Sequence, residues 1–501
     1  MDQSVRLVYA RLYTICSVCS TWRDIVMARG TLWSIIPLIP IPLANNLKTH
    51  ELSLQRARGS LLHLAADITY KSDMQKVLLK VLSEYGSRFE AVNLRLDERG
   101  LETVTSVIDT LLYHNTTGTW PLSELSIKLH NTHPRRIGRR IYHDDNDDDD
   151  DDDSNVHYTL PRDYEHIFPR DSPQQTSFIQ LLGSLTIFRV SGLLCYWDNV
   201  AFSSRLVKLQ IEKVTLGYDD KIVFFLNSLS SASELRDLTI SEVISFDKTD
   251  TTDGVNTHPV IVLPKLQSLL LQDLYFNTLS IILSAIGSSP QHLTLSLSDK
   301  CLSVYQIRTN FYQSTWGGEL DADVAVDDSG PKPVDHGELL AVLGSVRVNT
   351  VRLGRSLQPA VPQSLFCAIM ETMPTIQTLE IDRWYFDDEP LDDIPSASSQ
   401  SYVDQPDSEG RSFPVLENLH LTRITIYNRQ VFQKMVSSRS VRQIVVGGSI
   451  MTIDSSGDRS SHPLQESVDL LQWLQENIPH VRLVDSKYCP LEFHRPVWKL
   501  W

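Results

Sequence analysis

The sequence predicts an α/β fold built from repeated strand-and-helix units. Two recurring patterns indicate this fold. In the first, short segments carry an aliphatic residue at positions 1, 4, 6 and 9. In the second, the segments between them carry apolar residues three and four apart. Because the first pattern alternates with period two and the second follows the turns of a helix, strands and helices are expected in alternation.

The strand pattern occurs in five full copies, with Trp384 closing one of them. They are Leu206-Leu209-Ile211-Val214, Leu235-Leu238-Ile240-Val243, Leu266-Leu269-Leu271-Leu274, Ile376-Leu379-Ile381-Trp384 and Leu416-Leu419-Leu421-Ile424. Weaker strand-like segments lie at residues 92–96, 122–127, 185–190, 293–297, 348–353, 441–446 and 481–484. The intervals from Leu209 to Leu238 and from Leu238 to Leu269 are 29 and 31 residues, which favours stacked repeats with a helix in each unit.

The helical pattern fills the intervals between these strands. It occurs at residues 74–82, 104–112, 222–229, 279–286, 339–343, 365–373, 431–436 and 468–474. Five stretches rich in polar residues interrupt the alternation, and their composition cannot bury enough apolar surface to order them. We therefore expect disordered insertions near residues 131–173, 245–260, 317–335, 387–412 and 452–462.

Composition limits the classes of function. The net charge of −16 includes nine carboxylates between Asp144 and Asp153, which we interpret as a solvated loop, and no dense Lys/Arg face balances it. Nucleic acid is therefore not an expected partner. The longest apolar run, residues 35–44, contains three prolines and is too short to cross a bilayer, and no signal peptide is recognisable. These features predict no membrane anchor and a cytoplasmic or nuclear location.

No motif predicts an enzyme. The sequence lacks a glycine-rich phosphate loop, an H-E-x-x-H segment and a G-x-S-x-G segment. Cys16 and Cys19 form a C-x-x-C without a second ligand pair at zinc spacing, so we interpret them as two buried thiols on a helix. We expect no catalytic residue, no metal site and no cofactor.

The strand pattern resembles leucine-rich repeats from about residue 50 onward. The family places Asn or Cys at position 9, whereas this chain has Val214, Val243, Leu274, Trp384 and Ile424 there. Without an asparagine ladder, the resemblance implies an irregular leucine-rich-repeat solenoid, with strand-helix repeats in an arc spanning residues 46–501. Such arrays bind proteins on the outward residues of their strands. The expected target-binding residues are Asp237, Thr239, Ser241, Gln272, Thr378, Glu380, Asp382, Asn418, His420 and Thr422.

A second resemblance lies at the N-terminus. The segments Val18-Cys19-Ser20-Thr21-Trp22-Arg23-Asp24-Ile25 and Thr31-Leu32-Trp33-Ser34-Ile35-Ile36 are similar to the second half of an F-box. The usual opening L-P-x-E-I/L helix is missing before Met1-Asp2-Gln3-Ser4-Val5, so residues 1–45 are expected to form a helical F-box-like cap truncated at its N-terminus. The whole chain looks most like fungal F-box proteins with degenerate leucine-rich repeats.

The F-box resemblance implies a function. F-box helices bind the Skp1 adaptor of a cullin-type ubiquitin ligase, and the repeats hold a protein target. Carried over by position, the adaptor-binding residues would be Val18, Trp22, Ile25, Leu32 and Trp33. The alternative is a repeat scaffold with no ubiquitin-ligase link, in which the N-terminal helices only cap the first repeat.

Overall fold

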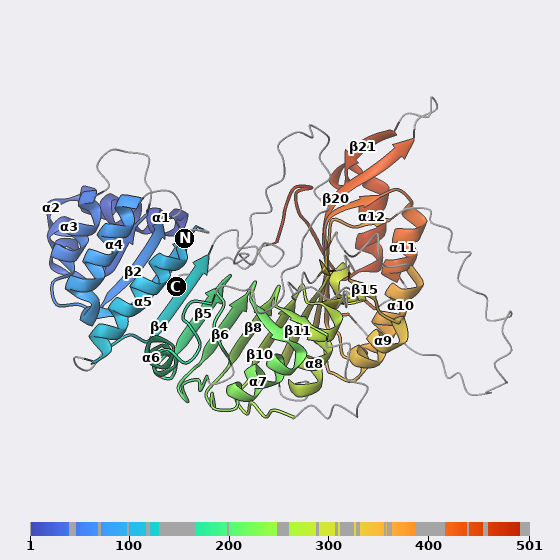
Figure 1. Cartoon of the computed structure of the whole chain (residues 1–501). Coiled ribbons are helices and arrows are strands. Elements are labelled where there is room, and N and C mark those ends of the chain that lie inside the picture. Colours follow the sequence, from blue (N-terminus) through green and yellow to red (C-terminus); the bar gives the residue numbers. More distant parts are fainter. Residues whose placement is uncertain are drawn as a thin grey trace, which may run out of the picture.

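One long sheet, whose strands follow one another in sequence order, organises the computed structural model (Figure 1). The structure describes residues 2–39, 47–68, 72–97, 100–116, 121–129, 166–197, 200–247, 260–286, 290–305, 309–310, 325–326, 331–354, 357, 363–386, 416–437, 440–453 and 459–490. The main strands are β1 (Ile35–Leu38), β2 (Leu62–Ile68), β3 (Phe89–Leu96), β4 (Glu124–Leu129), β5 (Ile187–Ser191), β6 (Lys208–Glu212), β8 (Asp237–Ser241), β10 (Ser268–Gln272), β11 (His292–Leu297), β16 (Thr350–Leu353), β17 (Thr378–Asp382), β19 (Asn418–Ile426), β20 (Gln443–Ile453) and β22 (His480–Leu483). All of these strands pair in parallel, as expected when helices connect them.

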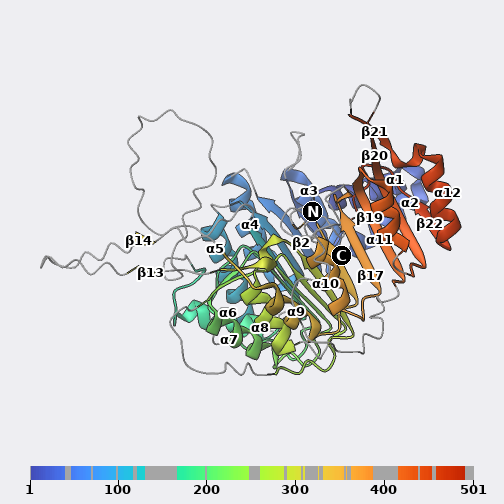
Figure 2. The same ribbon diagram turned by 90° about the vertical axis from the view of Figure 1, so that its right-hand side faces the viewer.

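Helices follow most of the strands and lie along one side of the sheet (Figures 1 and 2). They are α3 (Leu47–Ala57), α4 (Ser72–Tyr85), α5 (Leu101–Thr116), α6 (Pro173–Leu182), α7 (Asp219–Leu229), α8 (Phe276–Ile286), α9 (His336–Gly344), α10 (Gln363–Thr372), α11 (Arg429–Ser437) and α12 (Val468–Asn477). Successive helices pack against one another from α4 to α6 and from α7 to α10. At the β1 end stand α1 (Asp2–Val18), α2 (Ser20–Ala28) and the short 3₁₀ helix η1 (Gly30–Trp33).

The aliphatic residues of the strand pattern form the core between the sheet and the helices. In the five full copies every one of them is at most 3% exposed, except the partly buried Trp384. The predicted strands and helices are therefore confirmed in type, and they alternate in a mixed α/β fold around one long, mainly parallel sheet. A strand with inward aliphatic side chains and a helix with one apolar stripe are sufficient to build one strand-and-helix unit, because each covers the apolar face of the other.

A left-handed residue occupies position 8 in each of the five full copies; it directly follows the strand in the first four and lies inside β19 in the fifth. Position 8 is occupied by Lys213, Glu242, Asp273, Arg383 and Arg423, with φ between 50° and 57°. In the first four, the backbone N–H donates to a carbonyl on the next main strand, as from Lys213 to Ser241 at 3.0 Å. These backbone hydrogen bonds continue the pairing of neighbouring strands past position 8. They lie where a regular leucine-rich repeat would have its asparagine ladder.

Several expected boundaries change. The N-terminal segment is not helical throughout, since β1 (Ile35–Leu38) pairs with β2 and begins the main sheet. Residues 459–463 form β21 (Arg459–Pro463), which runs antiparallel to β20 inside an expected insertion. A small separate sheet joins β7 (Thr215–Tyr218) to β9 (Ile244–Phe246), so the insertion expected from residue 245 starts later.

Other expected insertions also contain described residues. The short strands β14 (Ala325–Val326) and β15 (Lys332–Pro333) lie within residues 317–335, and residues 166–173 lead into α6. The acidic run from Asp144 to Asp153 and the insertion at 387–412 lie outside the described residues. Among the described helices, none has the length and apolar character needed to cross a membrane.

Candidate protein-binding surfaces

Helix α1 carries apolar side chains on two faces. Val5, Tyr9 and Leu12 lie at helical spacing and are at most 7% exposed, so they form the inner face. On another face, Ile15 is 37% exposed and Val18 is 66% exposed. A helix that only covers a core normally carries polar residues on its solvent side. The outer apolar face of α1 is therefore not explained by packing within the described chain.

The exposed apolar surface continues onto α2 and η1. Trp22 is 52% exposed, Ile25 is 44% exposed and Leu32 is 38% exposed, while Val26 is the buried anchor of α2. We call Val18, Trp22, Ile25 and Leu32 the N-terminal apolar patch. The exposed charged residues of α1, of α2 and of the turn after α2 are mainly basic, and they include Arg6, Arg11, Arg23, Asp24 and Arg29.

Trp33 does not belong to this patch. Its side chain is 1% exposed, its indole Nε1 donates to the Val26 carbonyl at 2.9 Å, and the Arg56 guanidinium stacks 4.3 Å from its ring centroid. The adaptor contact expected of Trp33 stays a prediction, and within the chain this residue joins α2 to the core. Cys19 is also not buried as expected, since it is exposed at the break between α1 and α2.

The second surface is the face of the sheet opposite the helices, which we call the open face. Strand pairing aligns a central row across eight strands from β5 to β19. The central row consists of Ser191, Glu212, Ser241, Gln272, Ser296, Arg352, Glu380 and His420. The four strands with expected target-binding residues, β8, β10, β17 and β19, all contribute to this row, but β11 and β16 separate β8 and β10 from β17 and β19.

The expected residues of β17 and β19 meet in pairs. Asn418 donates from Nδ2 to Thr378 Oγ1 at 3.2 Å, and His420 Nδ1 lies 3.7 Å from Glu380 Oε1. Arg352 of β16 completes the group by donating from Nε to Glu380 Oε2 at 2.6 Å. Burial opposes ionisation of Glu380, but hydrogen bonding to His420 and the charge of Arg352 outweigh it and lower the pKa of this carboxyl.

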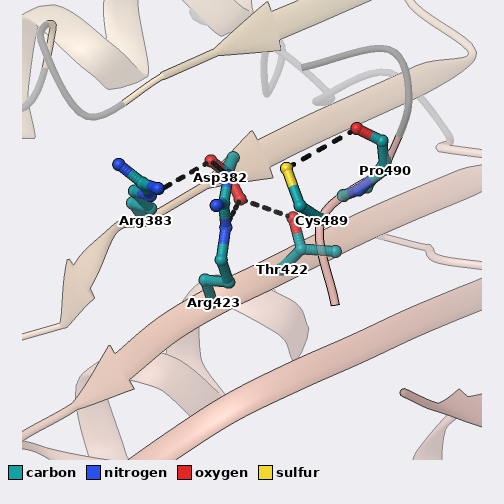
Figure 3. Close-up of polar contacts among 6 residues, drawn as sticks. All are labelled: Asp382, Arg383, Thr422, Arg423, Cys489 and Pro490. Atoms are coloured by element: carbon teal, nitrogen blue, oxygen red, sulfur yellow. Dashed lines mark hydrogen bonds and ion pairs between the residues drawn. The ribbon is translucent and has the colours of Figure 1, made fainter. Parts of the chain in front are cut away.

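Asp382 is the centre of a neighbouring polar cluster (Figure 3). Its carboxylate accepts from Thr422 Oγ1 at 2.9 Å and is held by two donors of the Arg423 guanidinium. This hydrogen bonding raises the pKa of Arg423, so its guanidinium stays charged at physiological pH. Because Asp382 is 4% exposed and paired, its contribution is to fix the strand ends.

Burial reduces the set of residues available to a target. Ser241 and Thr422 are fully buried, and Glu380 and Asp382 are at most 8% exposed, so these four do not form the accessible surface that their outward positions suggested. The remaining expected residues are half-buried, and they are Asp237, Thr239, Gln272, Thr378, Asn418 and His420. Asp237 and Thr239 lie on β8, next to Gln272 on β10 and apart from the residues of β17 and β19, and Asp237 accepts from Ser268 at 2.7 Å.

Three cations that the repeat pattern does not point to organise the open face. Arg189 of β5 donates to Ser126 at 3.0 Å and pairs with Glu124, and Lys128 Nζ lies 3.3 Å from the buried Glu212. Arg352 carries a recognisable signal, since it occupies the outward position inside the weak strand copy at 348–353. Among the described residues, no group of His, Cys, Asp and Glu is arranged to hold a metal ion.

Comparison with known proteins finds matches among solved structures. No protein-family model and no curated protein matches the sequence. Among solved structures, the chain is similar to the leucine-rich repeat-containing protein LegL7 from Legionella pneumophila. The sequence identity is 10%, the match covers 88% of this chain and 96% of that chain, and the TM-score is 0.34.

Proposed function

We propose that this chain is a non-enzymatic protein-binding repeat protein that acts as a substrate receptor of an SCF-type (Skp1-cullin-F-box) ubiquitin ligase. In this proposal α1, α2 and η1 hold a Skp1-like adaptor, and the open face holds a protein target. The site of action would be the cytoplasm or nucleus, where such ligases operate. No cofactor, nucleic acid or membrane takes part.

The observation that carries the proposal is the exposure of the N-terminal apolar patch. Val18, Trp22, Ile25 and Leu32 are each between 38% and 66% exposed. All four occupy positions at which the chain resembles an F-box. A large apolar group left in water costs free energy that a partner recovers when it covers the group, and exposed Trp residues are typical anchors of interfaces.

The test is adaptor binding by a double variant, Trp22→Ala with Ile25→Ala. We expect it to weaken binding of a Skp1-like adaptor by about tenfold or more, because both side chains would be central anchors. The matched control is Tyr113→Ala with Val468→Ala, which removes two side chains that are 68% and 73% exposed on other helices. Binding is measured by calorimetry with the full-length chain.

Folding is checked in parallel by urea unfolding. Neither double variant should lose more than about 1 kcal/mol, because exposed side chains contribute little to stability. The proposal fails if the natural chain does not bind the adaptor, or if the patch variant binds it as tightly as the control does.

One observation favours the alternative of a scaffold with no ubiquitin-ligase link. Val5, Tyr9, Leu12, Val26 and Trp33 are buried in the core that continues into β1, so the N-terminal helices also act as a cap. Terminal repeats need such a cap to shield their core from water. If the cap is its whole role, the chain binds no adaptor and the patch substitutions change no interaction.

A further inference from the structure

Two free thiols lie at the break between α1 and α2. Helix α1 ends at Val18, and Cys19 is the N-cap of α2, with an extended backbone at φ −161° and ψ 171°. Cys19 is exposed, and Cys16 in the last turn of α1 is half-buried. The C-x-x-C segment therefore reaches the surface at the junction of two helices, although two buried thiols were expected there.

The backbone spacing of Cys16 and Cys19 suits a disulfide. Cys16, Ser17 and Val18 are helical residues of α1. The rise and radius of an α-helix place Cα atoms three residues apart at a distance of about 5 Å. Disulfides join Cα atoms that are roughly 4.4–6.8 Å apart. The last turn of α1 therefore holds the two cysteines within bridging distance.

Arg23 places a positive charge beside this pair. Its Nε donates to the Cys16 carbonyl at 3.1 Å, and its backbone N–H donates to the Cys19 carbonyl at 3.1 Å. The first turn of α2 contains no acidic residue, and Asp24 follows only after Arg23. An exposed thiol in electropositive surroundings is the usual setting of a reactive cysteine. A small disulfide that carries carboxylates is attracted to such a setting.

The other described cysteines differ from this pair. Cys195 and Cys301 are at most 5% exposed, and burial raises the pKa of both thiols. Cys489 is half-buried, and burial also raises the pKa of its thiol. Cys19 is therefore the most accessible thiol among the described cysteines, and Cys16 is its nearest thiol neighbour in the sequence.

We propose that Cys16 and Cys19 form a redox modification site, at which exchange with a small disulfide such as oxidised glutathione closes a bridge across the α1–α2 break. The Cys19 thiolate attacks one sulfur of oxidised glutathione, which breaks its S–S bond and releases one glutathione thiolate. The Cys16 thiolate then attacks the Cys19 sulfur, forms the Cys16–Cys19 bond and releases the second glutathione thiolate. The two cysteines lose two electrons and two protons, and oxidised glutathione takes up both and becomes two thiols.

The bridge changes the junction of the two helices. It ties the last turn of α1 to the N-cap of α2, so it limits the angle at which the helices meet. Val18 precedes Cys19 directly, and Trp22 follows it within one helical turn. Oxidation therefore stiffens the part of the chain that carries the N-terminal apolar patch. The inference goes beyond the proposed function and does not depend on an adaptor.

The experiment treats four full-length chains with excess oxidised glutathione. They are the natural chain, Cys16→Ser, Cys19→Ser and the matched control Cys489→Ser. Remaining thiols are blocked with N-ethylmaleimide, and unreduced tryptic peptides are identified by mass spectrometry. Because Arg11 and Arg23 flank the site, both cysteines lie in one peptide, residues 12–23. A bridge makes this peptide lighter by two hydrogens, and a glutathione adduct makes it heavier.

The natural chain and Cys489→Ser should give the bridged peptide as the main product. Cys16→Ser should instead keep glutathione on Cys19, with at least about tenfold more adduct at this residue than the natural chain, because the thiol that resolves the mixed disulfide is missing. Cys19→Ser should form no bridge and little adduct, since Cys16 is half-buried. Amide exchange at residues 19–24 should be slower in the oxidised natural chain than in the reduced one.

Three outcomes overturn the inference. They are a natural chain that keeps glutathione on Cys19 without forming the bridge, a Cys16→Ser variant with no more adduct at Cys19 than the natural chain, and amide exchange that is the same in both redox states. None of these measurements includes an adaptor, so their failure is distinct from a failure of the proposed function.

Discussion

Buried carboxylates on the open face lie beside cations carried by nearby strands. Glu380 meets Arg352 at 2.6 Å and Glu212 meets Lys128 at 3.3 Å, and both carboxylates are at most 8% exposed. Removing one partner of such a pair leaves a buried charge, which is far more destabilising than the pair is stabilising. Substitutions that probe target binding should therefore use half-buried residues such as Asp237, Thr239 and Asn418.

The lowered pKa of Glu380 gives a prediction about acid stability. A carboxyl whose pKa is lower in the folded state stabilises the fold above its ordinary value of 4.5, and this contribution disappears as the pH falls through the folded pKa. Glu380→Gln should lower the free energy of unfolding at pH 7 by about 1–3 kcal/mol. The difference from the natural chain should shrink as the pH falls from 4.5.

Urea unfolding between pH 7 and pH 3 measures this difference. Glu417→Gln is the matched control. The Glu417 side chain is 51% exposed and its ion pair with Arg442 Nη1 is long, at 3.9 Å, so this pair contributes little to stability. A Glu380→Gln variant whose stability falls with pH in parallel with the natural chain would show that the Arg352–Glu380–His420 group does not stabilise the fold through its charge.

At the scale of single elements, the turn after each strand is the most characteristic feature. Lys213 has a φ of 53°, in the left-handed region that costs an ordinary side chain about 1–2 kcal/mol. Asn adopts this conformation readily, whereas a β-branched side chain does not. Lys213→Asn should therefore raise the free energy of unfolding by roughly 0.5 kcal/mol, and Lys213→Val should lower it by about 1 kcal/mol or more.

Lys208→Val provides the matched control for this turn. Lys208 lies in β6, five residues before Lys213, in an extended backbone that favours Val. Chemical unfolding should rank the chains with Lys213→Asn most stable and Lys213→Val least stable. If Lys208→Val and Lys213→Val are equally destabilising, loss of the lysine side chain is responsible and the turn carries no strain.

The sequence was sufficient for the repeating strands but not for the elements that depart from the pattern. Aliphatic residues at positions 1, 4, 6 and 9 located β6, β8, β10, β17 and β19. Strand β1 was missed because it contains Pro37, which is tolerated only because β1 is an edge strand. The left-handed turns were missed because Lys, Glu, Asp and Arg replace the usual signals Gly and Asn.

The binding surfaces, too, could be predicted only in part from the sequence. Outward positions could be assigned from the period-two pattern, but burial depends on which side chains stand opposite on the next strand. Asp382 and Thr422 are buried together because they stand opposite each other where β17 pairs with β19. The segment between these two strands, residues 387–415, lies outside the described chain, so the spacing of the sequence does not give this register. Trp33 was placed on the surface by resemblance, whereas its contacts with Val26 and Arg56 place it in the core.

At the scale of the whole molecule, the two candidate surfaces belong to different parts of the array. The N-terminal apolar patch lies on helices at the β1 end (Figure 1), whereas the cluster around Asp382 lies near the ends of β17 and β19, far along the strand order (Figure 3). A receptor in a ligase has to hold its adaptor and its target at the same time. The separation of the two surfaces along one sheet is compatible with that requirement.

We propose that an adaptor docks on the N-terminal helices and leaves the open face to the target. Hydrogen–deuterium exchange of the full-length chain, with and without a Skp1-like adaptor, measures this most directly. We expect slower exchange at residues 5–33 and unchanged exchange in β8, β17 and β19. Slower exchange confined to those strands, or no change anywhere in the described residues, would contradict it.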